Sequence, residues 1–495
     1  MNIEEEYIRL IFGLKLKQLR TDKNLSLFGL SKLSGLSKSY LNEIEKGKKY
    51  PKTTKIAILS NVLEVDYDNL VSLKLDKNLA PLGEILQSKI LKEIPLNLFG
   101  IKERDLIDII ANAPAKVSAF ITTLIEIAKN YNLSKESFYL AALRSYQEAH
   151  NNYFEDIELQ VEKFAKSYQI DTAKKIKSVD LEEILIEEFG YTIDKQTLKN
   201  YIEVKEIRSI YIVDKKTLLL SQHIDESQYA FILAKEIAYN YLNLSDRLYT
   251  FPWINFDTFD QVLHNFFASY FAGALLISRK RMNKELKLFF KRKEWSGSQF
   301  NKMIFKFTDS HETFYQRLTN ILPKYFNFKN MFFLRFKNKI NTNNYDLTKE
   351  LHINKLQAPY ANETNEHYCR RWISIDALKT VRESSIDNFI TSSQVSQYVE
   401  DKQEYLVISS ATSDPFKKDY NRSISVGILL NTNLKNKVKF LQDVSLGKSQ
   451  VGVTCERCII ENCEQRVSAP TVLDKIKKND IISNKVSEIV NSFVL

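Results

Sequence analysis

Glycine and proline are scarce in this chain, and their scarcity limits the folds open to it. The 495 residues include 12 Gly and 9 Pro, which is well below average usage. A loop-rich all-β architecture needs many such residues at its turns. Hydrophobic residues make up 44% of the chain, enough for large cores, and a chain of this length divides into about two to four domains. The composition therefore predicts a mainly α protein with a smaller α+β portion.

The net charge of +10 is concentrated in one short stretch near the N-terminus. Residues 9–55 contain twelve Lys or Arg residues and three acidic ones, a balance of +9. A local basic block of this kind is an electrostatic footprint for phosphate. We therefore expect nucleic acid as the partner of this stretch, with a merely solvated helix surface as the alternative.

No sequence feature predicts a membrane or secreted protein. The longest nearly apolar run, residues 266–277, is shorter than the ~20 residues that span a bilayer. The first seven residues, MNIEEEY, are acidic where a signal peptide is basic. Four cysteines in so long a chain do not form a secreted disulfide scaffold. The expectation is a cytoplasmic protein without membrane association.

Residues 9–70 have the pattern of five short helices that include a helix-turn-helix. Ser26 and Ser37 are suitable N-caps for the second and third helices. Gly35 suits the tight turn between these helices, and Gly47 suits the end of the third. Two helices joined by a short turn with glycine, the second with polar residues at its start, are typical of DNA binding.

The segment LSKLSGLSKSYLNEIEKGKKYPKTTKIAILSNVLEV, residues 30–65, resembles the Cro/CI-type (XRE) DNA-binding domain. In that family the third helix enters the major groove of double-stranded DNA. The resemblance implies that this helix contacts bases and that the lysines just after it contact the backbone. A helical bundle without a DNA role is the alternative. The predicted DNA-binding residues, with their caps, are Ser26, Ser37, Lys38, Ser39, Tyr40, Asn42, Glu43, Lys46, Lys48 and Lys49.

Further helices are predicted after the basic block. Residues 73–92 have the pattern of a linker, and residues 95–130 that of two amphipathic helices. Ser134 is expected to cap a single helix of about thirty residues, with apolar residues at three- and four-residue steps as far as Tyr168. A helix of that length is typical of a rod that joins domains or pairs subunits, and a helix lying along its own domain is the alternative.

In the middle of the chain, a predicted hairpin at 209–220 is followed by predicted helices at 227–242 and 260–277. This order of elements resembles the ImmA/IrrE-type metallopeptidase fold. The defining helix of that family carries His-Glu-x-x-His, in which two His hold zinc and the Glu activates water. Here the corresponding residues are Lys-Glu-Ile-Ala-Tyr at 235–239, so both metal-ligand positions lack an imidazole. We therefore expect no enzyme, and a metallopeptidase anti-repressor is disfavoured.

A peptidase-like fold that has lost its metal can keep a cleft for binding. Basic or polar residues within apolar elements would suit a phosphate-bearing ligand with an acyl tail. For each such residue an ordinary helix-surface role is the alternative. The candidate ligand-binding residues are Arg208, Lys235, Tyr270 and Arg335.

Three of the four cysteines lie within nine residues, in the segment TCERCIIENC at 454–463. The fourth is in HYCRRW at 367–372. A compact C-x2-C-x4-C triple with one distant cysteine is more typical of an iron–sulfur cluster than of zinc, and free or disulfide-forming thiols are the third possibility. The candidate metal ligands are Cys369, Cys455, Cys458 and Cys463.

The segment VGVTCERCIIENCEQRVSAP resembles the C-terminal signature of the short-chain fatty acyl (propionate/acetate-responsive) transcriptional regulators. HYCRRW is similar too, although Arg370 stands where those proteins usually have Pro. Weaker matches are NNYFEDIELQVEKFA, FASYFAGALLIS and HETFYQRLTNI. The resemblance covers nearly the whole chain in order. It implies acyl-CoA binding in the middle domain and a [4Fe–4S] cluster.

The sequence thus predicts a DNA-binding transcriptional regulator that acts as a homodimer on an operator. It would sense a short-chain acyl-CoA and carry an iron–sulfur cluster. The alternative is a zinc-stabilised DNA-binding repressor without a small-molecule effector. The predicted domains are an XRE helix-turn-helix domain at 1–72, a helical linker or dimerisation region at 73–170, an ImmA/IrrE-like domain without His-Glu-x-x-His at 171–325, and a cysteine-containing α+β domain at 326–495.

Overall fold

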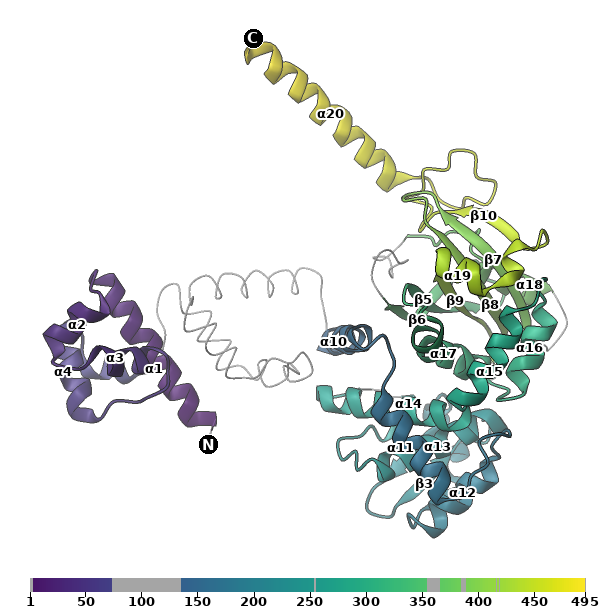
Figure 1. Ribbon diagram of the computed structural model, residues 1–495, viewed down its shortest axis with the longest axis horizontal. Helices are drawn as coiled ribbons and strands as arrows, with labels where there is room; N and C mark the ends of the chain where they lie inside the picture. Colours follow the sequence, from purple (N-terminus) through teal and green to yellow (C-terminus); the bar gives the residue numbers. More distant parts are fainter. Residues whose placement is uncertain are drawn as a thin grey trace. The chain divides into compact units, whose positions relative to one another are not determined.

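In the computed structural model the chain folds as two compact units (Figure 1). The first comprises residues 1–142 with 257–259, and the second comprises residues 143–256 and 260–495. The predicted linker, apart from its first residue, and the helices predicted at 95–130 lie outside the described residues. The residues that the structure describes are 3–73, 135–252, 255–353, 366–383, 389–414, 416–417 and 419–494.

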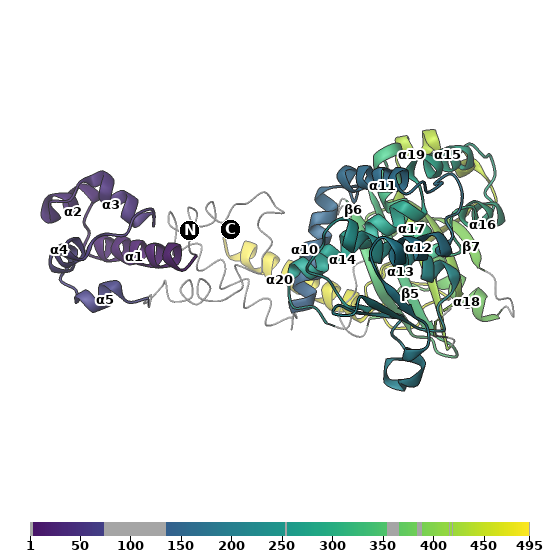
Figure 2. The ribbon, with the colours of Figure 1, turned by 90° about the horizontal axis from the view of Figure 1, so that it is seen from below.

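Five helices form the N-terminal domain, as predicted (Figure 2). Leu16, Leu41 and Ile44 are fully buried members of its apolar core. Gly13 lets the first helix pass close to the end of the third, because a Cβ at Gly13 would collide with the carbonyl oxygen of Ile44. The bounds are α1 Ile3–Asp22, α2 Leu27–Ser34, α3 Lys38–Glu45, α4 Thr53–Leu63 and α5 Tyr67–Val71.

The prediction of a single long helix from Ser134 is wrong, because this segment forms two helices separated by a break. Helix α10 spans Lys135–Ala149 and helix α11 spans Glu155–Ser167. Between them Asn151 and Asn152 have φ angles of 49° and 50°, a left-handed conformation that cannot continue a right-handed helix. The side chain of Asn152 donates a hydrogen bond to Thr319 Oγ1 at 2.7 Å, and this contact holds the break in place.

The second unit contains a small sheet with strand order β1-β3-β2-β4. Strands β2 and β3 pair antiparallel around the turn at 213–216, which confirms the predicted hairpin. The predicted helices at 227–242 and 260–277 are also present, as α13 Glu226–Tyr241 and α14 Phe259–Leu276. The strands are β1 Thr192–Asp194, β2 Ser209–Ile212, β3 Thr217–Leu220 and β4 Thr250–Phe251.

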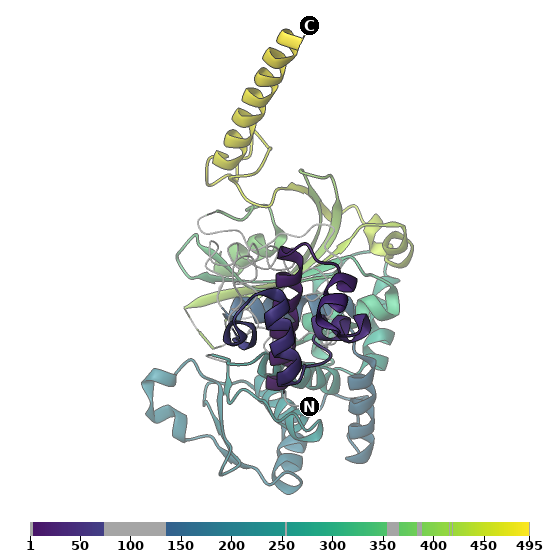
Figure 3. The ribbon, with the colours of Figure 1, turned by 90° about the vertical axis from the view of Figure 1, so that its left-hand side faces the viewer.

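The larger sheet has the order β10-β7-β8-β9-β5-β6 and is antiparallel except where β10 joins β7. One face packs on a large apolar cluster shared with helices α11 to α17, and the other face is covered by α18. Figure 3 shows the C-terminal helix, Thr471–Val494, in yellow, projecting from the body. Because this cluster runs from Phe154 to Leu446, the domain boundary at residue 325 stays a prediction. The strands are β5 Met331–Lys339, β6 Tyr345–Ile353, β7 Ile390–Tyr398, β8 Glu404–Ser413, β9 Tyr420–Leu429 and β10 Gly447–Val451.

The remaining helices surround these two sheets, except for the last, which leaves the body beside β10 (Figure 1). Short 3-10 turns occur at 197–200, 202–204 and 439–442, and a π turn at 322–326. The predicted mainly α architecture with a smaller α+β portion is confirmed. The helices are α12 Ser178–Glu187, α15 Arg279–Phe290, α16 Gly297–Phe305, α17 His311–Ile321, α18 Ile373–Glu383, α19 Thr432–Lys437 and α20 Thr471–Val494.

Candidate functional site

The start of helix α3 is fixed by local capping. The side chain of Ser37 accepts a hydrogen bond from the backbone N–H of Tyr40 at 3.2 Å, and Ser26 does the same for Gly29 at 3.0 Å at the start of α2. Gly35, between the two helices, has φ 68°, a conformation that glycine adopts without strain. Both predicted caps are therefore structural, and they set the angle at which α3 leaves the turn.

One face of α3 is buried and the other is open to solvent. Leu41 and Ile44 are completely buried, whereas Lys38 and Ser39 are exposed and Asn42 is half-buried. This arrangement presents polar side chains from the first two turns of the helix, as recognition helices do.

The lysines that follow α3 carry an exposed positive charge beside the helix. Lys48 and Lys49 are exposed, and Lys46 is half-buried at the helix end. Lys49 forms an ion pair with Glu43 at 2.8 Å, and its Nζ lies 5.9 Å from the centre of the Tyr40 ring. Glu43 and Tyr40 therefore position a cation, a role that the sequence pattern did not distinguish from direct contact with DNA.

Part of the N-terminal basic block holds the domain together. Arg20 binds the buried carboxylate of Glu45 through two hydrogen bonds, of 2.6 and 2.9 Å. Lys15 is buried and donates to the carbonyl oxygens of Asn69 and Ser72 at 2.7 and 2.8 Å. These cations join α1 to α3 and to α5, so the charge that faces a ligand is smaller than the sequence count of +9 suggests.

Substituting alanine for Ser37 is expected to lower the stability of the N-terminal domain without changing its fold. The change removes the cap from the backbone N–H of Tyr40, and losses of this kind cost about 0.5–2 kcal/mol. Urea unfolding followed by circular dichroism measures the difference. Ser39→Ala, on the exposed face of the same helix, is the matched control and should change the free energy of unfolding by less than about 0.5 kcal/mol.

A second candidate site lies on the larger sheet, where three neighbouring strands place cations on one face. Arg335 of β5 is directly opposite Lys349 of β6, and Lys337 of β5 is directly opposite Arg422 of β9. Like charges directly opposite each other on adjacent strands are destabilising. We call these four residues, with Arg208, the cationic cluster.

The cationic cluster surrounds one carboxylate, that of Glu312 in the first turn of α17. Arg335 donates to Glu312 at 2.7 Å, and Arg422 lies 3.6 Å from it. Burial alone would raise the pKa of Glu312, but Arg335 and the other cations, Arg208 among them, hold it well below its usual range. Asp414 lies 3.8 Å from Lys337. Among the residues that the structure describes, Glu312 and Asp414 are the carboxylates paired with the five cations of the cluster, which leaves an excess of positive charge.

Two cations of the cluster have unsatisfied donors. Arg422 is 6% exposed, and its Nε has no hydrogen-bond partner among the residues that the structure describes. The Nε of Arg208 likewise lacks a partner among these residues. The guanidinium of Arg208 lies 5.4 Å from the centre of the Phe251 ring and 5.3 Å from that of Phe416. Buried donors without acceptors are costly, so the arrangement suits an anionic ligand.

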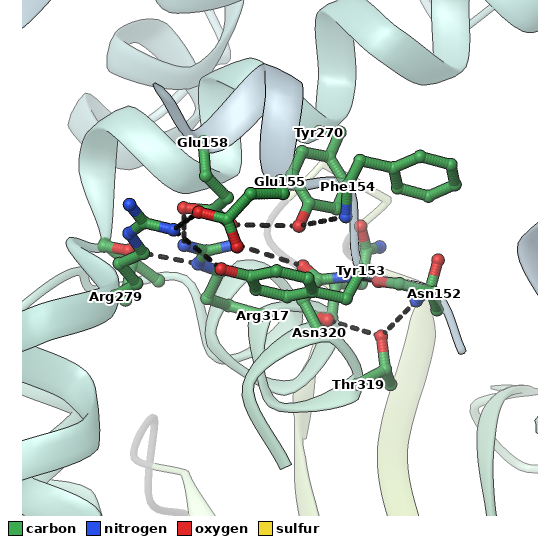
Figure 4. Close-up of polar contacts among 12 residues, drawn as sticks. Asn152, Tyr153, Phe154, Glu155, Glu158, Tyr270, Arg279, Arg317, Thr319 and Asn320 are labelled. Carbon is green, nitrogen blue, oxygen red and sulfur yellow. Dashed lines mark hydrogen bonds and ion pairs between the residues drawn. The ribbon is translucent and has the colours of Figure 1, made fainter. Parts of the chain in front are cut away.

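Of the four predicted ligand-binding residues, the structure gathers two, Arg208 and Arg335, around Glu312. Tyr270 belongs to a different network (Figure 4): its hydroxyl donates to Glu158 at 2.9 Å and accepts from the backbone N–H of Phe154 at 3.2 Å. Sequence reasoning missed Lys337, Lys349 and Arg422, because only the strand register brings them together, and it missed Glu312, because only tertiary packing brings α17 to these strands.

Lys235 occupies a buried position on α13. Its Nζ donates to Asn265 Oδ1 at 2.6 Å and lies 4.8 Å from the centre of the Phe251 ring. The next residue, Glu236, forms a buried ion pair with Arg247. In the sequence comparison Lys235 stands at the first His position of His-Glu-x-x-His, and a cation at that position would repel a metal ion.

Lys235→Met is expected to flatten the pH dependence of stability between pH 8 and 10.5. Burial lowers the pKa of Lys235 from 10.5 to about 8. In this range the unfolded chain binds more protons at this residue than the folded chain, so the burial penalty is fully present below pH 8 and stability rises with pH. Urea unfolding at pH 7.5 and pH 10 measures the slope, and the exposed Lys215→Met should leave it unchanged. Equal slopes for wild type and Lys235→Met would contradict the assignment.

The four cysteines come from two segments that are hydrogen bonded to each other. The backbone N–H of Cys369 donates to the carbonyl of Val453 at 3.1 Å, and that of Cys455 donates to His367 at 2.8 Å. Arg466 holds the cysteine loop, residues 454–463, by donating to the carbonyls of Cys455 and Cys458 at 2.7 and 3.2 Å. Arg466 therefore fixes the backbone of the cysteine loop.

All four cysteines are free thiols, and Cys369, Cys455 and Cys458 are buried. Burial raises the pKa of Cys369 to about 11, a penalty that a bound cation would offset by stabilising the thiolate. As a donor set, four unpaired thiols fit an iron–sulfur cluster or zinc. Within the described residues, however, no group of three or more His, Cys, Asp or Glu side chains is arranged to hold a metal ion.

Residues 16–70 match the family model described as helix-turn-helix. No curated protein matches the chain. Among solved structures, a Mycobacterium tuberculosis transcriptional regulator is similar at 18% sequence identity and a TM-score of 0.45, over 66% of this chain and 92% of that one. The family match, together with the capped and half-exposed α3, makes the N-terminal domain a helix-turn-helix DNA-binding domain.

In the parts of the chain that the structure describes, no helix combines the length and the apolar character that a membrane span requires.

Proposed function

We propose that this protein is a cytoplasmic transcriptional regulator that binds a specific operator through α3 as a homodimer. The observation that carries the proposal is the exposed polar face of α3, with Lys38, Ser39 and Asn42 presented above a fully buried Leu41 and Ile44. Base edges in the major groove are recognised by side chains of these kinds. The lysines after the helix add contacts to phosphate that carry no sequence information.

The second part of the proposal is that the larger unit senses an anionic metabolite on the cationic cluster. A short-chain acyl-CoA is the first candidate, because its phosphates would satisfy the excess positive charge and the free donors of Arg208 and Arg422. Such a ligand regulates DNA binding only if it binds two states of the protein with different affinity.

Arg422→Met is expected to weaken acyl-CoA binding by roughly ten- to a hundredfold, since a hydrogen bond to a charged group is worth about 1.5–3 kcal/mol. Isothermal titration of the full chain with acetyl-CoA and propionyl-CoA measures the affinity. Lys215→Met, in the exposed turn of the hairpin, removes one positive charge elsewhere and is the matched control. Absence of binding to the wild-type protein, or equal affinity for both variants, would contradict this part of the proposal.

The third part concerns the cysteines, which we propose hold a [4Fe–4S] cluster, with zinc as the alternative. Four free thiols on two hydrogen-bonded segments support it. When bound, the cluster would supply a site that responds to oxygen or redox state, and Cys369, Cys455, Cys458 and Cys463 would hold it. Anaerobic purification should give a brown protein with bound iron, and a colourless protein with one zinc per chain would favour the repressor without an effector. The proposal includes no catalytic activity.

A further inference from the structure

The C-terminal helix α20 presents apolar side chains to solvent along its length. It is 24 residues long, or about 36 Å at 1.5 Å per residue. The apolar residues from Ile476 to Val490 are half or more exposed, with Ile482 at 52%, Val486 at 54% and Ile489 at 51%. A contiguous exposed apolar surface on a soluble protein marks an interaction site.

Apart from Ile481, which falls at position c, the exposed apolar side chains follow a heptad repeat. With Val472 at position a, the repeat places Asn479 and Val486 at a, and Ile482 and Ile489 at d. Ile476 and Val490 fall at the neighbouring position e, and the apolar stripe formed by positions a, d and e is interrupted by Lys475, Asn479 and Ser483. This spacing is the pattern of a two-stranded coiled coil, in which a and d residues of one helix pack into holes of the other.

Asn479 decides which partner fits this stripe. In a groove of an unrelated protein its amide would be buried among apolar side chains and would lose its hydrogen bonds to water. Opposite a second copy of itself in a parallel pair, the amide finds a matching amide, and a single Asn at position a sets the register of such pairs. An antiparallel pair would instead bring Lys478 and Lys485, both at position g, toward the same positions on the other helix, where like charges repel.

The base of α20 is attached to the cysteine loop. The backbone N–H groups of Val472 and Leu473, in the first turn, donate to the carbonyl of Glu456 at 3.1 and 3.0 Å. Glu456 lies between Cys455 and Cys458, and its side chain accepts a hydrogen bond from the backbone N–H of His367 at 2.9 Å. The helix therefore starts on a fixed part of the second unit, which fixes its direction where it leaves the body.

We infer that α20 pairs with α20 of a second copy of this chain as a parallel, in-register coiled coil that begins at the cysteine loop. The inference deepens the homodimer of the proposed function by naming the surface that forms it. A parallel pair has a two-fold axis along the helices, the symmetry that a two-half-site operator requires.

Sedimentation of the full-length chain tests the pairing. Wild type should sediment as a dimer, and Ile482→Asp/Val486→Asp, which puts charges into the stripe, should sediment as a monomer. Ile481→Asp changes an equally apolar, 69% exposed residue on the opposite side of the helix and should remain dimeric. A monomeric wild type, or a double variant that stays dimeric, would overturn the inference.

Cross-linking tests the parallel register. In a parallel pair, Asn479→Cys places two equivalent thiols side by side, so mild oxidation should join two chains at position 479, located by mass spectrometry. Ile481→Cys should not cross-link at its own position. Failure of Asn479→Cys to cross-link in a dimeric protein would overturn the parallel register.

Binding to a single operator half-site separates this inference from the proposed function. The Ile482→Asp/Val486→Asp variant should bind one half-site as wild type does, and lose only the gain from two adjacent half-sites. If neither wild type nor the variant binds a single half-site, the result would instead count against the proposed DNA recognition.

Discussion

Arg317→Met is expected to destabilise the second unit by about 3–5 kcal/mol, the cost of leaving one partner of a buried ion pair without the other. Arg317 is 1% exposed and binds both oxygens of Glu158, at 2.6 and 2.8 Å (Figure 4). The same guanidinium donates to the carbonyl of Ile277 at 3.1 Å, and Glu158 also accepts from Tyr270. Without Arg317 the carboxylate of Glu158 stays buried among apolar residues with the tyrosine hydroxyl as its remaining donor in this network.

Urea unfolding of the full chain, followed by tryptophan fluorescence and circular dichroism, measures this loss. Lys175→Met is the matched control, because it breaks an ion pair with Asp309 that is exposed to solvent and worth about 1 kcal/mol or less. The double variant Glu158→Gln/Arg317→Met should recover part of the lost stability, since no charge is then left buried. An effect of Arg317→Met no larger than that of Lys175→Met would contradict the role assigned to the pair.

Lys38→Ala/Asn42→Ala is expected to lower the affinity for the operator by roughly a hundredfold or more, since each good base contact is worth about 1–3 kcal/mol. Both side chains lie on the open face of α3 and do not belong to its buried core. The fold should therefore be unchanged, and the affinity for unrelated DNA should fall much less. Fluorescence anisotropy with operator and unrelated duplexes at one fixed salt concentration measures both.

Lys46→Ala/Lys48→Ala provides the contrast for this prediction. These residues follow α3 and are expected to contact phosphates. Because phosphate contacts do not depend on the base sequence, the double variant should bind all sequences more weakly by about the same factor. The slope of log affinity against log salt should fall by about one for each lysine. Equal losses of specificity in the two double variants would contradict the assignment of α3 as the reading helix.

The parts of the fold that depend on local chemistry could be predicted from the sequence. Ser26, Gly35 and Ser37 fix the helix-turn-helix within a dozen residues, and the hairpin at 209–220 is fixed by its own turn. The long helix from Ser134 could not be predicted correctly, because its apolar spacing continues through Asn151 and Asn152. The break depends on a contact between Asn152 and Thr319, which lie far apart in the sequence.

The candidate sites, too, could be predicted only in part, because some of their residues meet through tertiary contacts. Arg208 and Arg335 were found as cations within apolar elements, but Arg422 and Lys349 join them only through the register of β9, β5 and β6. In the N-terminal domain, Arg20 and Lys15 counted toward the charge expected to face DNA. The structure uses both for contacts inside the domain, with Glu45 and with the carbonyls near α5. Charge counts locate a binding domain, whereas tertiary contacts decide which of its charges are free to bind.

Selection of bound duplexes from a random DNA library by the full-length protein tests the central claim most directly. Wild type should enrich one sequence present as two symmetric half-sites, and Lys38→Ala/Asn42→Ala should enrich none under the same conditions. Enrichment of the same sequence by both proteins, or of no sequence by wild type, would contradict operator recognition through α3.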